Sequence, residues 1–151
     1  MAYPTKNFSA LQAAFDAQIV SAKSQLTTRS TEMGAQSVPA STIVGVARFC
    51  VGLSAVIVAH KSQVVNTAGF ATFVAADKGT TTGALGTAID TLKTAVDGVV
   101  TAAKAIPPVD AGGYLMIYQL AADGSMTERK FTSAETAALR TAISSAVAEI
   151  G

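Results

Sequence analysis

The chain has 151 residues, of which 50% are hydrophobic, 14% are charged and 6% are aromatic, and its formal net charge is +1. A nearly neutral chain has no overall positive field that would attract nucleic acid or an anionic membrane surface. Its single cysteine, Cys50, excludes an intrachain disulfide framework and a cluster of thiolate metal ligands. We therefore expect one domain over residues 1–151, long enough to enclose a hydrophobic core without either.

The first predicted element is an amphipathic helix at about residues 6–29. Its apolar residues recur at steps of three and four, which is the period of one helix face: Phe8, Leu11, Phe15, Ile19, Ala22 and Leu26. The polar stretch 27–37, with Gly34 and then Pro39, is typical of a helix end. We expect the helix to stop there.

A second helix is predicted at about 41–60, where residues 43–59 are almost continuously apolar. These 17 residues approach the length needed to cross a bilayer, but a central Arg48 is costly in a membrane. A central helix of a soluble bundle, or a helix buried between subunits, has the same composition. Residues 62–77 continue the apolar pattern, either as a further helix or as an extension with a bend near Gly69.

The clearest pattern lies at 84–106. Apolar residues are spaced four and three apart over three heptads: Leu85, Ile89, Leu92, Val96, Val99, Ala103 and Ile106. This pattern predicts a helix that packs against the first helix or the apolar one and ends at Pro107-Pro108. Lys93 lies one turn from both Asp90 and Asp97, a pairing typical of a solvated helix surface.

The period then changes to that of strands. Residues 114–120 and 126–131 are strand-like and flank Asp123-Gly124, which predicts a β-hairpin at about 114–131. Thr132 and Glu135 have the spacing of a capping box, so a final short helix is expected at 133–150. One face of this helix is lined by Leu139, Ile143, Val147 and Ile150. The predicted fold is mainly α, a bundle of four to five helices with a C-terminal hairpin and a final short helix.

The sequence offers little for catalysis. Cys50 lies among apolar residues and is interpreted as a buried structural thiol. His60, the only histidine, is placed at the end of the apolar helix, where a cation favourably meets the helix dipole. The segment 79–83 lacks the Lys-Ser/Thr ending of a phosphate-binding loop. We expect no enzyme activity, cofactor, metal, small-molecule substrate or specific nucleic acid.

The hairpin is the predicted interaction element, because it joins an apolar strand to a charged one and has edges that can pair with another chain. A lone hairpin is marginal in water, so it must dock on the helices or on another subunit. The candidate interface residues are Tyr114, Met116, Tyr118, Leu120, Arg129 and Phe131.

A helical bundle rich in Ala, Thr and Val, followed by the hairpin segment 114–131 and a short helix, resembles small virion proteins of tailed bacteriophages. In outline it is similar to their head-to-tail connector, or adaptor, proteins. The resemblance implies a ring of copies under the portal, with helices for subunit packing and an extended element for docking. It implies partners that are copies of the chain and other virion proteins, portal or capsid, and synthesis in the bacterial cytoplasm. It rests on architecture, and no residue role is carried over from it.

Two other interpretations remain open. The same composition suits a head-decoration or other capsid-associated protein. It also suits a cellular helical interaction module, or a membrane-associated protein that uses the apolar helix at 43–59 as its contact. Native mass separates a ring from a monomer, and dependence on detergent would favour the membrane.

Overall fold

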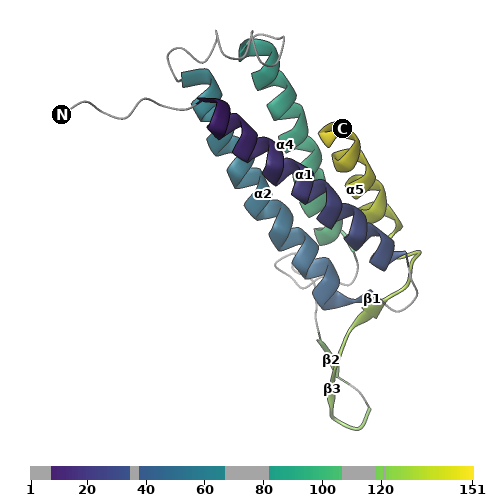
Figure 1. The fold of residues 1–151 in the computed structure, drawn as a ribbon. Helices are drawn as coiled ribbons and strands as arrows, with labels where there is room; N and C mark the ends of the chain where they lie inside the picture. Colours follow the sequence, from purple (N-terminus) through teal and green to yellow (C-terminus); the bar gives the residue numbers. More distant parts are fainter. Residues whose placement is uncertain (1–7, 35–37, 67–81, 107–117, 121) are drawn as a thin grey trace, which may run out of the picture.

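The computed structural model describes residues 8–34, 38–66, 82–106, 118–120 and 122–151. Within them the fold is mainly α, as predicted: four helices lie side by side as a bundle, and a hairpin extends from one end (Figure 1). The helices are α1 (Phe8–Met33), α2 (Ala40–Asn66), α4 (Thr82–Lys104) and α5 (Ala137–Ile150).

Two small antiparallel sheets lie at the hairpin end of the bundle. Strand β2 (Tyr118–Leu120) pairs with β3 (Met126–Glu128), and β1 (Val38–Pro39) pairs with β4 (Lys130–Phe131). The strand that leaves the hairpin therefore continues directly into the sheet beside the bundle. The hairpin predicted at 114–131 is confirmed over 118–128, and residues 114–117 lie outside the described part.

The core lies between the helices. Helix α4 packs extensively against α2 and α5, α1 packs against α5, and α1 touches α2 much less. The core side chains are Phe15, Ile19, Ala22, Leu26 and Met33 from α1; Ile43, Val46, Cys50, Leu53 and Ile57 from α2; Ile89, Leu92, Val96, Val99 and Ala103 from α4; and Leu139, Ile143 and Ala146 from α5.

The seam predicted on α4 is confirmed. All its members from Ile89 to Ile106 are buried and Leu85 is partly buried against the core. Of the two packing partners predicted for this seam, the structure selects the apolar helix α2, and it adds α5. A heptad seam suits helices that cross at a shallow angle in a bundle.

Helix α1 runs to Met33, four residues past the predicted end at about residue 29, and it ends inside the polar stretch 27–37 that was predicted to stop it. Near this end Thr27, Thr28 and Thr31 each donate a hydrogen bond of 2.9–3.0 Å to the carbonyl four residues earlier, so their hydroxyls find partners within the helix. Arg29 and Glu32 form an exposed ion pair at 2.9 Å. Met33 is fully buried, and its burial favours continuing the helix into the core.

Helix α2 runs without interruption from Ala40 to Asn66, past the predicted end at residue 60, so of the two predicted alternatives the extension is confirmed as far as Asn66. The second predicted segment begins as an extension of the same helix, and its remainder, 67–77, lies outside the described residues. Within this continuation Lys61 contacts Asp90 of α4, with its Nζ 2.6 Å from Oδ2. His60 is consequently an interior residue rather than a helix terminus.

Helix α5 begins at Ala137, four residues later than predicted, because residues 133–136 form tight turns. The reciprocal bonds of the predicted capping box are present, although they close the turns and the N-cap of α5 is Thr136 rather than Thr132. The Thr132 N–H donates to Glu135 Oε1 at 3.1 Å, and the Glu135 N–H donates to Thr132 Oγ1 at 3.3 Å. The Thr136 hydroxyl donates to the Met33 carbonyl at 2.9 Å. This buried bond ties the turns to the end of α1.

Candidate interaction surfaces

The hairpin projects beyond the end of the bundle (Figure 1). Its turn is ordered by Asp123, whose Oδ1 accepts hydrogen bonds from the Ser125 N–H at 2.9 Å and the Ser125 hydroxyl at 2.6 Å. These bonds, the hydroxyl bond first, lower the pKa of the Asp123 carboxyl. Gly124 has φ +85°, a conformation that side chains disfavour. The predicted turn at Asp123-Gly124 is therefore confirmed.

The base of the hairpin is attached to the N-terminus of α2. The Ala40 N–H donates to the Arg129 carbonyl at 2.8 Å, and the Ser41 N–H donates to Glu128 Oε1 at 2.9 Å. The first amides of a helix have no partner within the helix, so a strand distant in sequence satisfies them. Hydrogen bonding by Ser41, hydroxyl first and then backbone, lowers the pKa of the Glu128 carboxyl.

Arg129 connects the same base to the start of α5. Its guanidinium lies 4.5 Å from the centre of the Phe131 ring and 3.5 Å from Glu135 Oε2, the carboxylate that also takes part in the capping box. The hairpin base thus contacts α2 and the turns that precede α5, and Phe131 is buried in the core. A projecting element held in this way has a fixed direction relative to the bundle.

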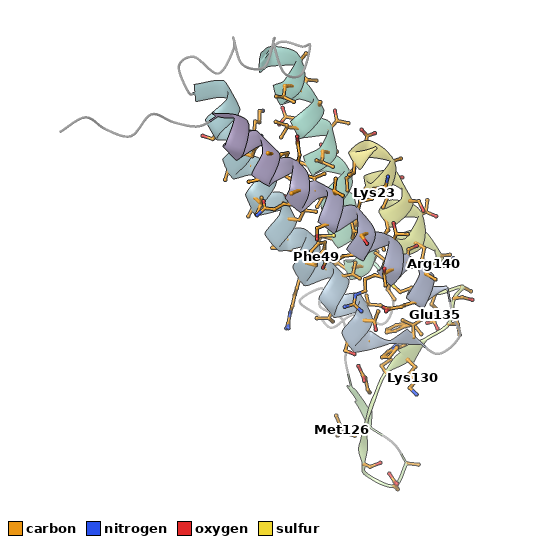
Figure 2. All side chains as sticks on the ribbon, viewed as in Figure 1. Lys23, Phe49, Met126, Lys130, Glu135 and Arg140 are labelled. Atoms are coloured by element: carbon orange, nitrogen blue, oxygen red, sulfur yellow. The ribbon has the colours of Figure 1, made fainter. Side chains whose placement is uncertain are left out.

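The candidate interface residues fall into three groups. Tyr114 and Met116 lie outside the described residues, and Tyr118 and Leu120 are placed as members of β2 by their backbone. Arg129 is partly buried, and Phe131 is 1% exposed, so Phe131 supports the fold and is not available on the surface. Sequence reasoning omitted Met126, which is 62% exposed on the hairpin (Figure 2).

Helix α2 presents a second surface, which we call the outer face of α2. It is exposed and almost entirely apolar, with Arg48 as its one charged residue: Gly45, Arg48, Val51, Gly52, Ala55, Val56, Val58 and Ala59. Val51 and Val58 are 58% and 48% exposed. Exposed valines gathered on one face are typical of an interaction surface rather than of scattered surface residues.

A groove of about 640 Å³ borders this face and is lined by residues of α1 and α2. Small residues, Ala17 and Ser21, line its α1 side, while Phe49 and Val56 line its α2 side. Arg48 lies at the same groove and forms no ion pair with a described residue. The groove and the outer face form one continuous, mainly apolar surface.

Cys50 and His60 are buried on the opposite face of α2. Burial, followed by the nearby Asp97 carboxylate, raises the pKa of the Cys50 thiol to about 12. His60 stacks on Phe15 of α1, with ring centroids 3.8 Å apart and planes inclined by 5°. The predicted role of His60 at the helix C-terminus is wrong, because α2 continues past it to Asn66. Both residues hold helices together.

The acidic residues of α4 also connect helices. Asp97 accepts a hydrogen bond from the Ser54 hydroxyl of α2 at 2.7 Å and pairs with Lys93, as predicted. The bond from Lys93, more than that from Ser54, lowers the pKa of the Asp97 carboxyl. Asp90 pairs with Lys61 of α2 instead of Lys93. Among the described residues no group of three or more His, Cys, Asp or Glu side chains is arranged to hold a metal.

Helix α2 contains a stretch, Ala40–Ser62, that is long and apolar enough to cross a bilayer, with a mean hydropathy of 2.1. A third of its most apolar window, 33%, is buried inside the bundle. Core helices of soluble proteins meet the same criterion of length and composition.

The described chain is therefore a mainly α protein, a helical bundle with a projecting hairpin. Comparison with protein-family models, with characterised proteins and with solved structures finds no match. The inference of function rests on the two surfaces described above.

Proposed function

We propose that the chain is a non-catalytic structural subunit of a tailed-phage virion, a head-to-tail connector or adaptor that assembles as a ring. The observation that carries the proposal is the hairpin, which projects from the bundle and is fastened at its base to α2 and to the turns that precede α5. Short exposed strands can add to a sheet of another subunit. A rigid body with one such strand pair suits assembly rather than turnover of a substrate.

The outer face of α2 supports the same proposal. Its exposed valines lie on a helix whose other face already fills the core, so the fold itself gives them no burial. Association with another protein surface would remove them from water, which is the main favourable term in most protein association. A subunit with two such surfaces can contact more than one neighbour.

The test is a native mass measurement on the purified full chain. A large closed ring, or a ring that forms when portal protein is added, is the expected result. A stable monomer that binds neither portal nor capsid protein would contradict the proposal. A small oligomer that binds only the outside of assembled capsids would support the head-decoration alternative instead.

Variants of the hairpin test whether its exposed residues are needed for the assembly that native mass measures. Replacing Met126, which is exposed, with Asp is expected to reduce assembly while leaving the helix content by circular dichroism unchanged. The matched control is Val20→Asp, since Val20 is 65% exposed on α1 and lies outside both surfaces. The double change Met116→Asp and Tyr118→Asp extends the test to the strand that precedes the turn. Equal loss of assembly and helix content would identify the hairpin as core.

A membrane-associated protein, or a cellular helical interaction module, is the second candidate. The exposure of apolar residues along α2 is the specific observation that favours it. A requirement for detergent during purification would support the membrane form, and binding to no virion protein would support the cellular module.

A further inference from the structure

Two aspartates of the chain are followed directly by glycine, in the pairs Asp97-Gly98 and Asp123-Gly124. Such a pair can rearrange without an enzyme, because the glycine nitrogen can attack the side-chain carboxyl of the aspartate. Glycine has no Cβ to obstruct that approach. The two pairs have the same covalent chemistry, so a difference in reactivity between them must come from their surroundings in the fold.

The rearrangement has two steps, written here for the second pair. The backbone nitrogen of Gly124 forms a bond to Cγ of Asp123, while a C–O bond of the carboxyl breaks and its oxygen leaves as water with the amide proton. Water then opens the resulting five-membered ring at the main-chain carbonyl of Asp123. The chain continues through the former side chain, and the residue is isoaspartate. Neither step is a redox step, and water is the only co-reactant.

The surroundings of Asp97 oppose ring closure. Asp97-Gly98 lies in the interior of α4, where each amide is hydrogen-bonded to the carbonyl four residues earlier. The ring closes only if the Cα–C bond of the aspartate rotates away from the helical ψ of about −42°. The Asp97 carboxylate is also held by the Ser54 hydroxyl, at 2.7 Å, and by Lys93. Rearrangement at this site therefore requires α4 to open, and α4 packs against both α2 and α5.

The surroundings of Asp123 offer much less resistance. Asp123, Gly124 and Ser125 are all exposed in the turn between β2 and β3, on the hairpin that projects from the bundle (Figure 1). Both hydrogen bonds described for the Asp123 carboxylate come from Ser125, only two residues away. Rotation of Asp123 therefore disturbs the turn and leaves the helices intact. Local openings of this kind need far less free energy than opening of the core.

We propose that Asp123 is a site of spontaneous isomerisation to isoaspartate, and that α4 protects Asp97 from the same reaction. The product adds one carbon to the main chain of the turn, between the paired residues Leu120 and Met126. Because the base of the hairpin is fastened separately through Glu128, the change is expected to stay within β2 and β3. The inference does not depend on the proposed assembly, although it concerns the element that the assembly needs.

Peptide mapping of the full chain, aged at neutral pH and physiological temperature, tests the site. Cleavage after lysine and arginine separates the two pairs into the peptides 94–104 and 105–129. An isoaspartyl peptide keeps its mass but elutes separately, and electron-transfer fragmentation distinguishes Asp123 from Asp110 in the second peptide.

The expected result is isoaspartate at Asp123 and none at Asp97 in the native chain. Chain aged in urea is the control and should isomerise at both positions, because the helix is then absent. A native chain in which Asp123 isomerises no faster than Asp97 would overturn the proposal.

Asparagine variants repeat the comparison with a readout by mass. Asp123→Asn and Asp97→Asn close the same ring with loss of ammonia, and hydrolysis then leaves an acid that is heavier than the amide. Asp123→Asn is expected to convert on the order of tenfold faster or more in the folded protein, because the turn opens more readily than α4. Circular dichroism before ageing checks that both variants keep their helix content. Equal rates in the two folded variants would overturn the protection by α4.

Discussion

Two aspartates of α4 fix the position of α2 along it. Ser54 bonds to Asp97, and Lys61 pairs with Asp90, so the partners are seven residues apart on each helix and run in opposite directions. An exposed ion pair contributes little to stability, typically about 0–1 kcal/mol. The main effect of these contacts is to fix the register of α2 along α4, because a shift of one helix by one turn would break both of them.

The buried thiol leads to the first prediction, which concerns reactivity. Cys50 is 0% exposed, and burial with the nearby Asp97 raises the pKa of its thiol to about 12. The thiolate is the reactive form, so native protein at pH 8 is expected to react with a thiol reagent only as fast as it unfolds. Absorbance after addition of a chromogenic disulfide measures this rate, with denatured protein as the control. Rapid stoichiometric reaction of the native chain would contradict the buried position.

Glu128 leads to a prediction of pH dependence. Hydrogen bonding by Ser41 lowers the pKa of Glu128 below its ordinary value of 4.5 in the folded protein. A carboxyl with a lowered folded pKa adds stability above its unfolded pKa and loses it as the pH falls through the folded pKa. Glu128→Gln is therefore expected to lower the thermal midpoint at neutral pH and to have no effect in strong acid.

The comparison for Glu128 is made by circular dichroism melts of both proteins over a series of pH values. Glu149→Gln, which removes an exposed carboxylate of α5, provides the control. A difference between wild type and Glu128→Gln that stays constant down to strong acid would show that the charge of Glu128 is unimportant for the helix.

At the scale of the elements, the sequence predicted the buried face of a helix only where polar residues separate the apolar ones. On α4 the seam residues alternate with Thr, Lys and Asp, and the predicted seam is buried as expected. On α2 nearly every residue is apolar, so the sequence does not show which residues form the buried face. In the structure the buried positions are nevertheless spaced three and four apart: Ile43, Val46, Cys50, Leu53 and Ile57. Its buried and outer faces emerge only from packing.

The hairpin likewise has local features that the sequence predicted and long-range contacts that it did not. Its turn followed from Asp123-Gly124, a local signal, and the structure confirms it. The attachment of its base did not follow, because Glu128 and Ser41 are 87 residues apart and no local pattern links them. The capping box of Thr132 was local and was found, whereas the bond from Thr136 to Met33, across 103 residues, was not.

Gly124 provides an element-scale prediction. With φ at +85°, alanine at this position should cost about 1 kcal/mol, because a Cβ is strained in that conformation. The hairpin projects from the bundle, so the loss should be local: amide exchange in β2 and β3 should accelerate about fivefold while the helices keep their protection. Gly98→Ala, in open space within α4, should instead stabilise the chain by up to about 1 kcal/mol. Destabilisation of equal size by both would refute the assigned turn.

For the whole molecule, α5 is the helix that joins α1 to the rest of the bundle. It packs against both α1 and α4, while α1 touches α2 only sparsely. Leu139 is 0% exposed, and Leu139→Ala should destabilise the protein by about 2–5 kcal/mol through lost burial and a cavity. Denaturant unfolding measures the change, and exposed Ala138→Ser is its control. A loss below about 1 kcal/mol would mean that α5 is not part of the cooperative core.

The last whole-molecule prediction concerns the bilayer. If α2 crossed a membrane, its contacts with α4 would have to break, exposing Cys50 and Ile57 on one helix and Val96 and Val99 on the other. The Lys61–Asp90 pair would be lost as well, and Arg48 would lie near the centre of the span, which costs about 2.5–3.5 kcal/mol. We therefore expect the chain to remain in the aqueous fraction when floated with phosphatidylcholine vesicles, with a helix content equal to that of protein without vesicles. Flotation of the wild-type chain together with labelling of Cys50 by a thiol reagent would show that the bundle opens on the membrane, and would replace the assembly interpretation of the outer face of α2 with a membrane one.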